Sequence, residues 1–476
     1  MSQSLEARAR HLMKDPIGFF DNSITKMHRM PKEEVEALQR IGMSIRFKEH
    51  SKSIEILRNL TQRLGITEVK EFNDLVPLLF PHTVFKSYPP ALLDKKRFDL
   101  LNQWLNKVTN VDISKVDVSG CDSIDAWLDR MDQQTPITII TSSGTTGTIS
   151  LIPKGKEAFH YGMRVWRTFL FQTFGEEPTK ASLYPDVDVI WPNFAGGRLG
   201  SLRLADYLKT EFTGGNERRF HALYPAALDT DLTFLASKMR AAASRGELDR
   251  LKIDPKLLAR KAEFEAMQAR APQEMAAFLD KCMRELRGKR VLMIGPYNML
   301  HDLAAEGLKK GIRNVFARDS AIMTGGGLKG YKVPENWREL VKEFLGVDRI
   351  QEMYGMSEVG VSNWACEAGH YHVQPWNIPY VLDPDTNEPL TREGVQTGRA
   401  AFFDLMNEVH WGGAISGDEI TIDWSTPCRC GLASVHIHHD IMRFSEKQGV
   451  EDDRITCAAT QQVTSEVIDF MRGYES

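Results

Sequence analysis

The sequence contains no apolar run of the roughly 18–20 residues that a helix needs to cross a bilayer. Residues 1–10 are polar and lack the apolar centre of a secretory signal peptide. We therefore expect a cytoplasmic protein that is not associated with a membrane.

Cysteine is scarce, with six residues in a chain of 476. Six cysteines are too few to form a stabilising framework of disulfides in a chain of this length, which indicates a reducing compartment. Four of them nevertheless lie in the last quarter of the sequence: Cys366, Cys428, Cys430 and Cys457.

Excess charge is also missing, because the formal net charge is only −4. This value argues against general electrostatic binding of nucleic acid, although it leaves a local basic patch open. With 42% hydrophobic and 26% charged residues the chain can bury a large core. The sequence has no internal repeat and no low-complexity tract.

Apolar residues at three- and four-residue spacing predict helices over 33–47, 51–64 and 97–108, with an extended segment over 79–89. Further along, strands are predicted over 187–191, 290–294, 321–328 and 350–359. Helices are predicted over 160–174, 301–311 and 337–345, with two or three more within 232–286. This alternation is typical of an α/β fold with parallel strands, in which ligands lie beyond the carboxyl ends of the strands. The sequence becomes β-rich beyond residue 380.

A strand predicted to end with Ile137, Ile139 and Ile140 runs into a loop of hydroxyls and glycines. The loop consists of Ser142, Ser143, Gly144, Thr145, Thr146 and Gly147. Glycines permit unusual φ angles, and exposed N–H groups together with hydroxyls can surround an anion. The loop is not a Walker loop, because no Lys-Ser/Thr pair follows Gly147. An ordinary polar turn has the same composition, so the motifs that follow must decide between the two.

Three later segments accompany this loop: Gly325, Gly326 and Gly327; Tyr354, Gly355, Met356, Ser357 and Glu358; and Ser416, Gly417 and Asp418. In this order the four segments resemble the motifs of the adenylate-forming superfamily of acyl-CoA synthetases, adenylation domains and luciferases. The resemblance covers residues 142–418. It implies an α/β fold in which a large N-terminal domain has parallel sheets flanked by helices and a β-rich subdomain, and it implies activation of a carboxylic acid by ATP.

The resemblance also assigns roles. The loop 142–147 would grip the β- and γ-phosphates, with Thr146 as a catalytic residue, and the three glycines would lie along adenine. Tyr354 would stack on or beside adenine, Glu358 would hold catalytic Mg²⁺, and Asp418 would accept hydrogen bonds from the ribose. Ser357 replaces the more usual Thr and keeps the hydroxyl. Taken singly, Asp418 is equally consistent with a turn residue, Glu358 with a surface carboxylate and Tyr354 with a core residue.

Within the superfamily the chain is most similar to the phenylacetate–CoA ligase branch, which has cysteines and a histidine around the nucleotide motifs. The matching residues are Cys366, His372, Cys428 and Cys430. Three thiolates and one imidazole suit tetrahedral Zn²⁺, so the resemblance implies a structural zinc site. His370 is the rival for the fourth ligand, and unligated reduced cysteines are the alternative.

Residues 192–200, which begin with a proline, are predicted to form a loop after the strand 187–191, and the segment 193–200 lies where this family forms its acyl pocket. Phe194, Gly196 and Gly197 are therefore candidates for contacts with an aryl or other flat, apolar acid, although a plain glycine turn is as good an interpretation. We expect a helical region over 1–110, an adenylation core over 111–425 and a vestigial C-terminal segment over 426–476.

The chain departs from the family in two ways. The lysine that usually follows the phosphate loop is delayed to Lys154 or Lys156, of which we take Lys154 as the catalytic candidate. The family's mobile C-terminal lid, with its Pro-Lys-x-x-x-Gly-Lys pattern, has no match in residues 419–476, so we expect a truncated lid. Arg443 and Lys447 are candidates for a residual basic contact.

With a truncated lid, the chain resembles the acyl-protein synthetases of bacterial luminescence and the adenylating proteins of phenazine pathways. In the former a cysteine near the C-terminus carries the acyl group, and Cys457 matches it. The leading hypothesis is an enzyme that uses ATP and Mg²⁺, forms an acyl-adenylate with release of AMP, and transfers the acyl group to CoA, a carrier protein or an amine. The alternatives are acyl transfer through Cys457, with a reductase partner, and a non-catalytic nucleotide-binding relative. A homodimer is one expected assembly.

Overall fold

The computed structural model describes residues 4–142, 148–175, 187–325 and 334–444. Contacts divide the chain into two compact units. Unit 1 comprises 1–140, 151–169 and 354–451, and unit 2 comprises 141–150, 170–353 and 452–476. Among the described residues, no helix is both long enough and apolar enough to span a bilayer. The domain limits expected from the sequence stay a prediction.

The first part of unit 1 is helical, as predicted. Its helices are α1 (Leu5–Lys14), α2 (Pro16–Phe19), α3 (Ile24–Arg29), α4 (Lys32–Ser53), α5 (Glu55–Leu64), α6 (Ala91–Asp94), α7 (Phe98–Val108) and α8 (Ile124–Gln134). Serine side chains cap α1, α3 and α8 by accepting a hydrogen bond from the first turn, which satisfies an otherwise unpaired N–H group. Helix α5 ends at Gly65, whose φ of +67° is the left-handed conformation that stops a helix.

The second part of unit 1 is β-rich, as predicted. Its strands are β9 (Val361–Ala365), β10 (Tyr371–His372), β11 (Asn377–Leu382), β12 (Val395–Asp404), β13 (Gly413–Asp423), β14 (His436–Ile437) and β15 (Met442–Arg443). They follow the order β11-β12-β13-β14-β10-β9, while β15 and β1 (Phe80–Pro81) also pair with β13. The side chains packed beneath them include Phe402, Ile420 and Ile422, all fully buried. A small second sheet joins β2 (Ile137–Thr141) and β3 (Leu151–Gly155), and α9 (Lys156–Thr173) follows it.

Unit 2 is built on parallel strands. They are β4 (Asp188–Gly197), β5 (Phe220–Leu228), β6 (Val291–Ile294), β7 (Ala321–Gly325) and β8 (Ile350–Met356), in the order β8-β7-β6-β4-β5. Every pairing among them is parallel, which requires a crossover between consecutive strands. The helices in these crossovers are α10 (Gly200–Tyr207), α11 (Thr230–Ser244), α12 (Pro255–Ala259), α13 (Lys261–Asp280), α14 (Tyr297–Lys309) and α15 (Trp337–Leu345). The predicted α/β class is confirmed.

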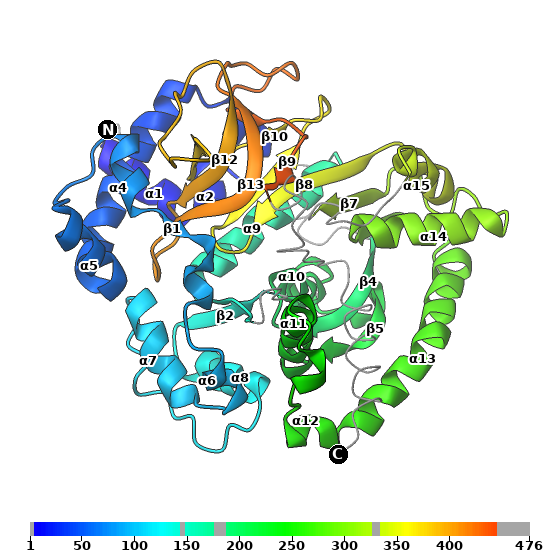
Figure 1. Cartoon of the computed structure of the whole chain (residues 1–476). Coiled ribbons are helices and arrows are strands. Elements are labelled where there is room, and N and C mark those ends of the chain that lie inside the picture. Colours follow the sequence, from blue (N-terminus) through cyan, green and yellow to red (C-terminus); the bar gives the residue numbers. More distant parts are fainter. Residues whose placement is uncertain (1–3, 143–147, 176–186, 326–333, 445–476) are drawn as a thin grey trace. The chain divides into compact units, whose positions relative to one another are not determined.

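Helices α14 and α15 lie side by side next to β7 (Figure 1). A Cβ atom at Gly307 would lie only 2.0 Å from the ring of Phe344 in α15. Glycine at this position therefore allows the two helices to approach closely, which a side chain would prevent.

Two local predictions were wrong. The segment 79–89 is not extended, because the 3₁₀ helices η1 (Phe72–Leu78) and η2 (His82–Lys86) border the two-residue strand β1. The segment 193–200 is not a loop throughout, because β4 continues to Gly197. Its residues pair with β5 up to Leu228 through two irregularities in register, which accommodate the proline and glycines that suggested a loop.

Candidate functional site

Tyr354 and Asp418, which come from different motifs, are in direct contact in unit 1. The Tyr354 hydroxyl donates a hydrogen bond of 3.0 Å to Asp418 Oδ2. Burial, and then the Asp418 carboxylate, raise the pKa of Tyr354 well above its ordinary value, so the phenol stays protonated and acts as the donor. Residues that are 64 positions apart in the sequence thus form one polar pair.

Arg443, on the neighbouring strand, forms an ion pair with Asp418. Asp418 on β13 lies opposite Arg443 on β15, and Arg443 Nε is 3.4 Å from Asp418 Oδ1. The Asp418 backbone N–H donates to Ser416 Oγ at 3.1 Å. Of the two basic residues named as candidates for a residual contact, Arg443 therefore reaches a nucleotide-motif residue, while Lys447 lies outside the described residues.

Tyr354 also belongs to the core. Its side chain is 9% exposed and packs with the aromatic residues Tyr371 and Phe402, at ring-centroid distances of 6.2 and 6.3 Å. Packing and hydrogen bonding together fix the position of its ring. A stacking contact with adenine stays a prediction.

Lys154, Glu358 and Asp404 form a second polar group in unit 1. Burial lowers the pKa of Lys154, while the charges of Asp404 and Glu358 act to raise it. Burial likewise raises the pKa of Asp404, and the charge of Lys154 opposes this rise. Lys154 on β3 thus lies in the field of both carboxylates, which agrees with its choice as the delayed lysine of the phosphate loop.

Asp404 was missed by the sequence reasoning, although it holds the turn that carries Glu358. Its Oδ2 atom accepts a 2.8 Å hydrogen bond from the Gly360 N–H group. A Cβ atom at Gly360 would approach the same oxygen to 2.6 Å, so this contact requires glycine. In the sequence, the only sign of this contact is Gly360, which lies two residues after Glu358.

The predicted phosphate loop is closed at its base in unit 2. The Ser142 N–H group donates to the Ser150 carbonyl at 3.3 Å, and the Ser150 N–H group donates to Ser142 Oγ at 2.9 Å. The hydroxyls of Thr141, Ser150 and Thr324 are buried without a hydrogen-bond partner in the described part of the chain. The other loop residues, Ser143, Gly144, Thr145, Thr146 and Gly147, lie outside the described residues, as do Gly326 and Gly327.

Phe194 is 3% exposed in β4 and packs on Tyr224 of β5, with ring centroids 4.8 Å apart. A Cβ atom at Gly196 would meet Asp206 Oδ1 at 3.2 Å, and one at Gly197 would meet Leu202 Cδ1 at 2.8 Å. The two glycines therefore allow α10 to pack on β4. Their predicted contact with substrate is untested.

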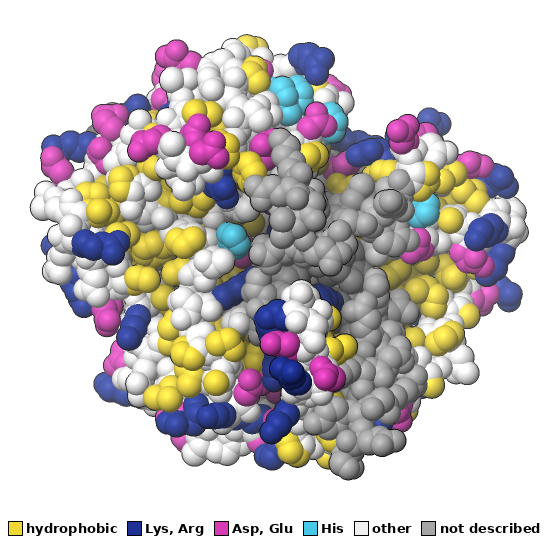
Figure 2. All heavy atoms as spheres, in the orientation of Figure 1, with side chains coloured by type: hydrophobic (Ala, Val, Ile, Leu, Met, Phe, Trp, Pro, Cys, Tyr) yellow, Lys and Arg dark blue, Asp and Glu magenta, His cyan; other side chains and the backbone are white. Residues whose placement is uncertain are grey.

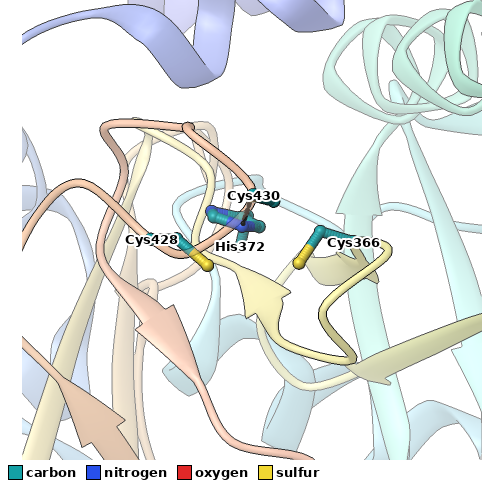
Figure 3. A group of neighbouring side chains, drawn as sticks. All are labelled: Cys366, His372, Cys428 and Cys430. Carbon is teal, nitrogen blue, oxygen red and sulfur yellow. Dashed lines mark hydrogen bonds between the residues drawn. The ribbon is translucent and has the colours of Figure 1, made fainter.

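Cys366, His372, Cys428 and Cys430 come together in unit 1, and we call these four residues the Cys/His cluster. One ligand atom from each residue lies within 4.8 Å of those of the other three. Figure 3 shows Cys366 from the end of β9, His372 from β10 and both other cysteines from the segment after β13, gathered around one space. His372 Nε2 is 3.3 Å from Cys430 Sγ.

Two turns of the same kind present the cysteines. In each turn a glycine N–H group donates to the carbonyl of the cysteine three residues earlier, from Gly369 to Cys366 at 2.9 Å and from Gly431 to Cys428 at 2.8 Å. Both glycines have a positive φ, +80° and +84°, which glycine adopts most readily. The repeated Cys-x-x-Gly spacing was the sequence signal for these turns, and it was overlooked.

The donor set of the Cys/His cluster fits a zinc ion. Burial raises the pKa of the Cys430 thiol to about 12 and also raises the pKa of Cys428, while it lowers the pKa of His372 to about 4. The cluster thus carries no positive charge of its own near neutral pH. A divalent cation would stabilise the thiolates, because a thiol that coordinates a metal loses its proton.

Ser434 fixes the ring of His372 from the side away from the sulfurs. Its hydroxyl lies 2.8 Å from His372 Nδ1 and 3.0 Å from His28 Nδ1. Burial lowers the pKa of His28 well below its ordinary value, so His28 is neutral. Such partners of a metal-binding imidazole fix its orientation and tautomer. The rival ligand His370 instead places Nδ1 3.2 Å from Cys428 Sγ.

The candidate nucleotide residues are distributed over both units. Tyr354, Glu358, Lys154 and Asp418 belong to unit 1, while the loop base, Gly325 and Phe194 belong to unit 2. Cys457, the candidate acyl carrier, lies outside the described residues.

No protein-family model and no curated protein matches this chain. Among solved structures, 2-hydroxyisobutyryl-CoA ligase in the postadenylation state with R3-HIB-AMP aligns with a TM-score of 0.45 at 13% identity, over 88% of this chain and 73% of that chain. The same ligase in an open conformation with 2-HIB-AMP and CoA gives a TM-score of 0.43 at 12% identity, over 87% and 76%. Apo MatB from Rhodopseudomonas palustris gives 0.33 at 14% identity, over 64% and 47%. Scores of this size at such low identity assign no family.

Proposed function

We propose that this protein activates a carboxylic acid with ATP and then transfers the acyl group to a thiol or an amine. The observation that carries this proposal is the 3.0 Å contact between Tyr354 and Asp418. The family resemblance assigns their two motifs to adenine and to ribose, which are adjacent parts of one nucleotide. The residues that would bind them must therefore be neighbours, and they are.

In the proposed reaction, a carboxylate oxygen of the acid attacks the α-phosphorus of ATP and pyrophosphate leaves with the electrons of the broken P–O bond. Little covalent chemistry falls to the protein, so its contribution is to position the reactants and stabilise the departing charge. Glu358 would hold Mg²⁺ on the phosphates, in a turn that Asp404 anchors through Gly360. Lys154 would supply a positive charge near that turn.

An aryl or other flat, apolar acid is the substrate class that we favour. Phe194 and Tyr224 form a pair of aromatic rings with centroids 4.8 Å apart, and Gly196 and Gly197 follow Phe194 on the same strand. The Tyr224 hydroxyl is buried without a hydrogen-bond partner among the described residues, which makes it a candidate to orient a polar substituent or the carboxylate. CoA, a carrier-protein thiol and an amine are the proposed acceptors.

The Cys/His cluster would hold a structural zinc ion. With three sulfurs and one nitrogen it offers a closed set of four ligands, which is the form of structural rather than catalytic zinc sites.

The test is exchange of labelled pyrophosphate into ATP, measured with a panel of aryl and short aliphatic acids. Exchange requires adenylation but no acceptor, so it reports the first half-reaction alone. We expect Asp418→Asn to reduce exchange by roughly 100-fold or more, since a site that loses one preorganised group loses this much. Tyr354→Phe keeps the ring and removes only the donor, so we expect a smaller loss.

Glu393→Gln is the matched control, because Glu393 is an exposed carboxylate in the same unit. It should exchange like the parent. If the parent catalyses no exchange with any acid in the panel while it binds ATP, the proposed reaction is wrong. If Asp418→Asn exchanges at the parental rate, the nucleotide is not held by this pair.

A further inference from the structure

A second group of metal-ligand side chains lies beside the Cys/His cluster. Asp423, His436 and His438 each offer one ligand atom, and these three atoms lie within 4.8 Å of one another. Asp423 ends β13 and lies directly opposite His436 of β14 in the sheet register. His438 follows two positions later, which brings it to the same side of the chain as His436, since successive side chains of extended backbone alternate.

One ring nitrogen of His436 in this group lacks a hydrogen-bond partner among the described residues. Its side chain is only 3% exposed, and its Nδ1 atom is buried without a hydrogen-bond partner in the described ranges. Its Nε2 atom is 3.7 Å from Asp423 Oδ2, which is beyond hydrogen-bonding distance. Nε2 is therefore the ring nitrogen that faces Asp423, and it is the atom available to an ion held between the two side chains.

Asp423 is oriented for such a role. Its Oδ1 atom accepts a 2.8 Å hydrogen bond from the Ser425 N–H group, and its Oδ2 atom is left on the side of His436. A carboxylate held by a backbone donor in this way is typical of the partners around metal ligands. The backbone of His438 is also fixed, because its N–H group donates to the Thr421 carbonyl at 2.9 Å.

His370 lies next to both this group and the Cys/His cluster. Its ring stacks on His436 at 4.6 Å and on His438 at 5.1 Å, with interplanar angles of 16° and 12°. Its Nδ1 atom lies 3.2 Å from Cys428 Sγ, on the side of the cysteines. The two sets of ligands are thus adjacent: His370, Cys428 and His436 also offer ligand atoms within 4.8 Å of one another, and the rings of His372 and His436 lie 5.7 Å apart.

We propose that Asp423, His436 and His438 form a second metal site, which binds a divalent transition-metal ion such as Zn²⁺, Co²⁺ or Ni²⁺. Two imidazoles and one carboxylate favour these ions over Mg²⁺ and Ca²⁺, which prefer oxygen ligands. With metal–nitrogen distances of about 2.0–2.1 Å, ligand atoms around one ion lie about 3.3 Å apart.

Three protein ligands leave one coordination position open, unlike the closed set of the Cys/His cluster. The Asp423 side chain is 23% exposed, so this position is accessible to water or to an added ligand. Figure 2 shows histidine side chains at the surface next to acidic side chains in the β-rich part of unit 1. The second site is accordingly expected to exchange its metal faster than the Cys/His cluster.

The experiment is a titration of the metal-free full chain with Co²⁺, followed by absorption spectroscopy. Cobalt at the Cys/His cluster produces thiolate-to-metal charge-transfer bands, whereas cobalt held by Asp423, His436 and His438 contributes only weak visible bands. We expect two equivalents to bind and only one of them to produce the charge-transfer signal. The same preparation is loaded with Zn²⁺ and analysed for metal content.

His438→Ala should lose the Co²⁺ equivalent that produces no charge-transfer bands, or bind it at least about tenfold more weakly. It should keep the Co²⁺ equivalent that produces these bands. His439→Ala is the matched control, because His439 is the neighbouring histidine and its side chain is 66% exposed. Asp423→Asn is a second variant that keeps the side-chain shape and should also weaken only the second equivalent. Circular dichroism checks that each variant is folded.

The proposal is overturned if the parent binds a single equivalent, or if His438→Ala and Asp423→Asn both retain two equivalents with parental affinity. It is also overturned if His439→Ala loses the second equivalent while His438→Ala keeps it. Because no arm uses ATP or an acid, these outcomes are independent of the proposed adenylation.

Discussion

The Cys/His cluster and the group of Lys154, Asp404 and Glu358 are both partly or fully buried in unit 1, and both consist of ionisable side chains. In the cluster no member carries an opposite charge for another, and burial is the largest cause that keeps the Cys428 and Cys430 thiols and the His372 imidazole neutral. In the Lys154 group a cation lies in the field of two carboxylates, and the opposite charges partly offset the burial that lowers the pKa of Lys154 and raises the pKa of Asp404. The cluster needs an ion from outside to become charged, whereas the Lys154 group holds opposite charges of its own.

This difference indicates what each region can do. Soft, uncharged donors that converge on one point favour a transition metal held permanently. Fixed charges of both signs are suited to a ligand that arrives and leaves, such as a nucleotide with Mg²⁺, because the protein stays folded in its absence. Single substitutions in each region test this difference.

The largest effect is expected from Cys430→Ser, which removes one soft ligand from the Cys/His cluster. We expect loss of bound zinc and destabilisation by about 4 kcal/mol, since loss of a structural metal is among the most destabilising single changes. Metal analysis and chemical denaturation measure both quantities. Cys121→Ser is the control, because Cys121 lies outside the cluster and is partly exposed. Unchanged zinc content in Cys430→Ser would exclude this residue as a ligand.

Lys154→Met removes the only cation from its group. The buried carboxylate of Asp404 then loses the largest charge that opposes its burial, and we expect destabilisation by about 3 kcal/mol. Pyrophosphate exchange should fall as well, whereas zinc content should not change. Lys115→Met, at a side chain that is 88% exposed, should change neither stability nor exchange. If Lys154→Met is as stable as the parent, the description of the group as charge-compensated is wrong.

The next effect is on pH dependence near the Lys154 group. Burial lowers the pKa of His50 to about 4, and its Nε2 atom lies 3.1 Å from the Glu408 carbonyl. Between the unfolded pKa of about 6.5 and the folded value, only the unfolded chain takes up this proton, so stability falls as the pH falls through this window. On lowering the pH from neutrality to 4, the free energy of unfolding should fall by up to about 3 kcal/mol less in His50→Gln than in the parent.

The measurement for His50→Gln is the free energy of unfolding at several pH values between neutrality and pH 4. Gln keeps an amide donor for the Glu408 carbonyl, so stability at neutral pH should change little. His160→Gln, at an exposed position of α9, should keep the parental pH slope. An unchanged slope in His50→Gln would show that this imidazole is not excluded from protonation in the folded state.

The smallest effect is expected from Ser434→Ala. This change removes the hydroxyl beside His372 Nδ1 but leaves all four members of the cluster. We expect zinc affinity to fall by roughly 10–100-fold, as is usual for partners of metal-binding histidines. The global stability of the zinc-loaded protein should fall by only about 1 kcal/mol. Competition with a chelator measures the affinity, and parental affinity would argue against zinc ligation by His372.

Much of the fold was predictable from local patterns. The helix over 337–345 and the strands near 187–191, 290–294 and 321–328 are found where hydrophobic spacing placed them. The exceptions are instructive, because both contain proline or glycine: 79–89 was predicted to be extended and includes a 3₁₀ helix, whereas 193–200 was predicted to be a loop and is a strand up to Gly197. In 193–200 these residues are accommodated by irregularities in a paired strand, and pairing depends on β5, which lies far along the sequence.

The candidate site was predictable only in part. The residues of the Tyr354–Asp418 contact and of the Cys/His cluster were named from motifs, but neither contact follows from spacing. Asp404 and Ser434 carry no motif, and they act only because the fold brings them to Gly360 and His372. Such partners are set by packing between distant segments, which a single sequence does not encode locally.

The kinds of chemistry can be read from the amino acids alone: soft ligands at Cys366, Cys428 and Cys430, a hydroxyl-rich loop at 142–147, and alternating strands and helices. Which side chains lie together depends on the fold. The fold brings His372 to all three cysteines, places His370 beside Cys428 and His436, and gathers Asp423, His436 and His438. The physical reason is that residue type sets what an atom can bind, whereas convergence of several atoms on one point requires strands to be paired and turns to be closed.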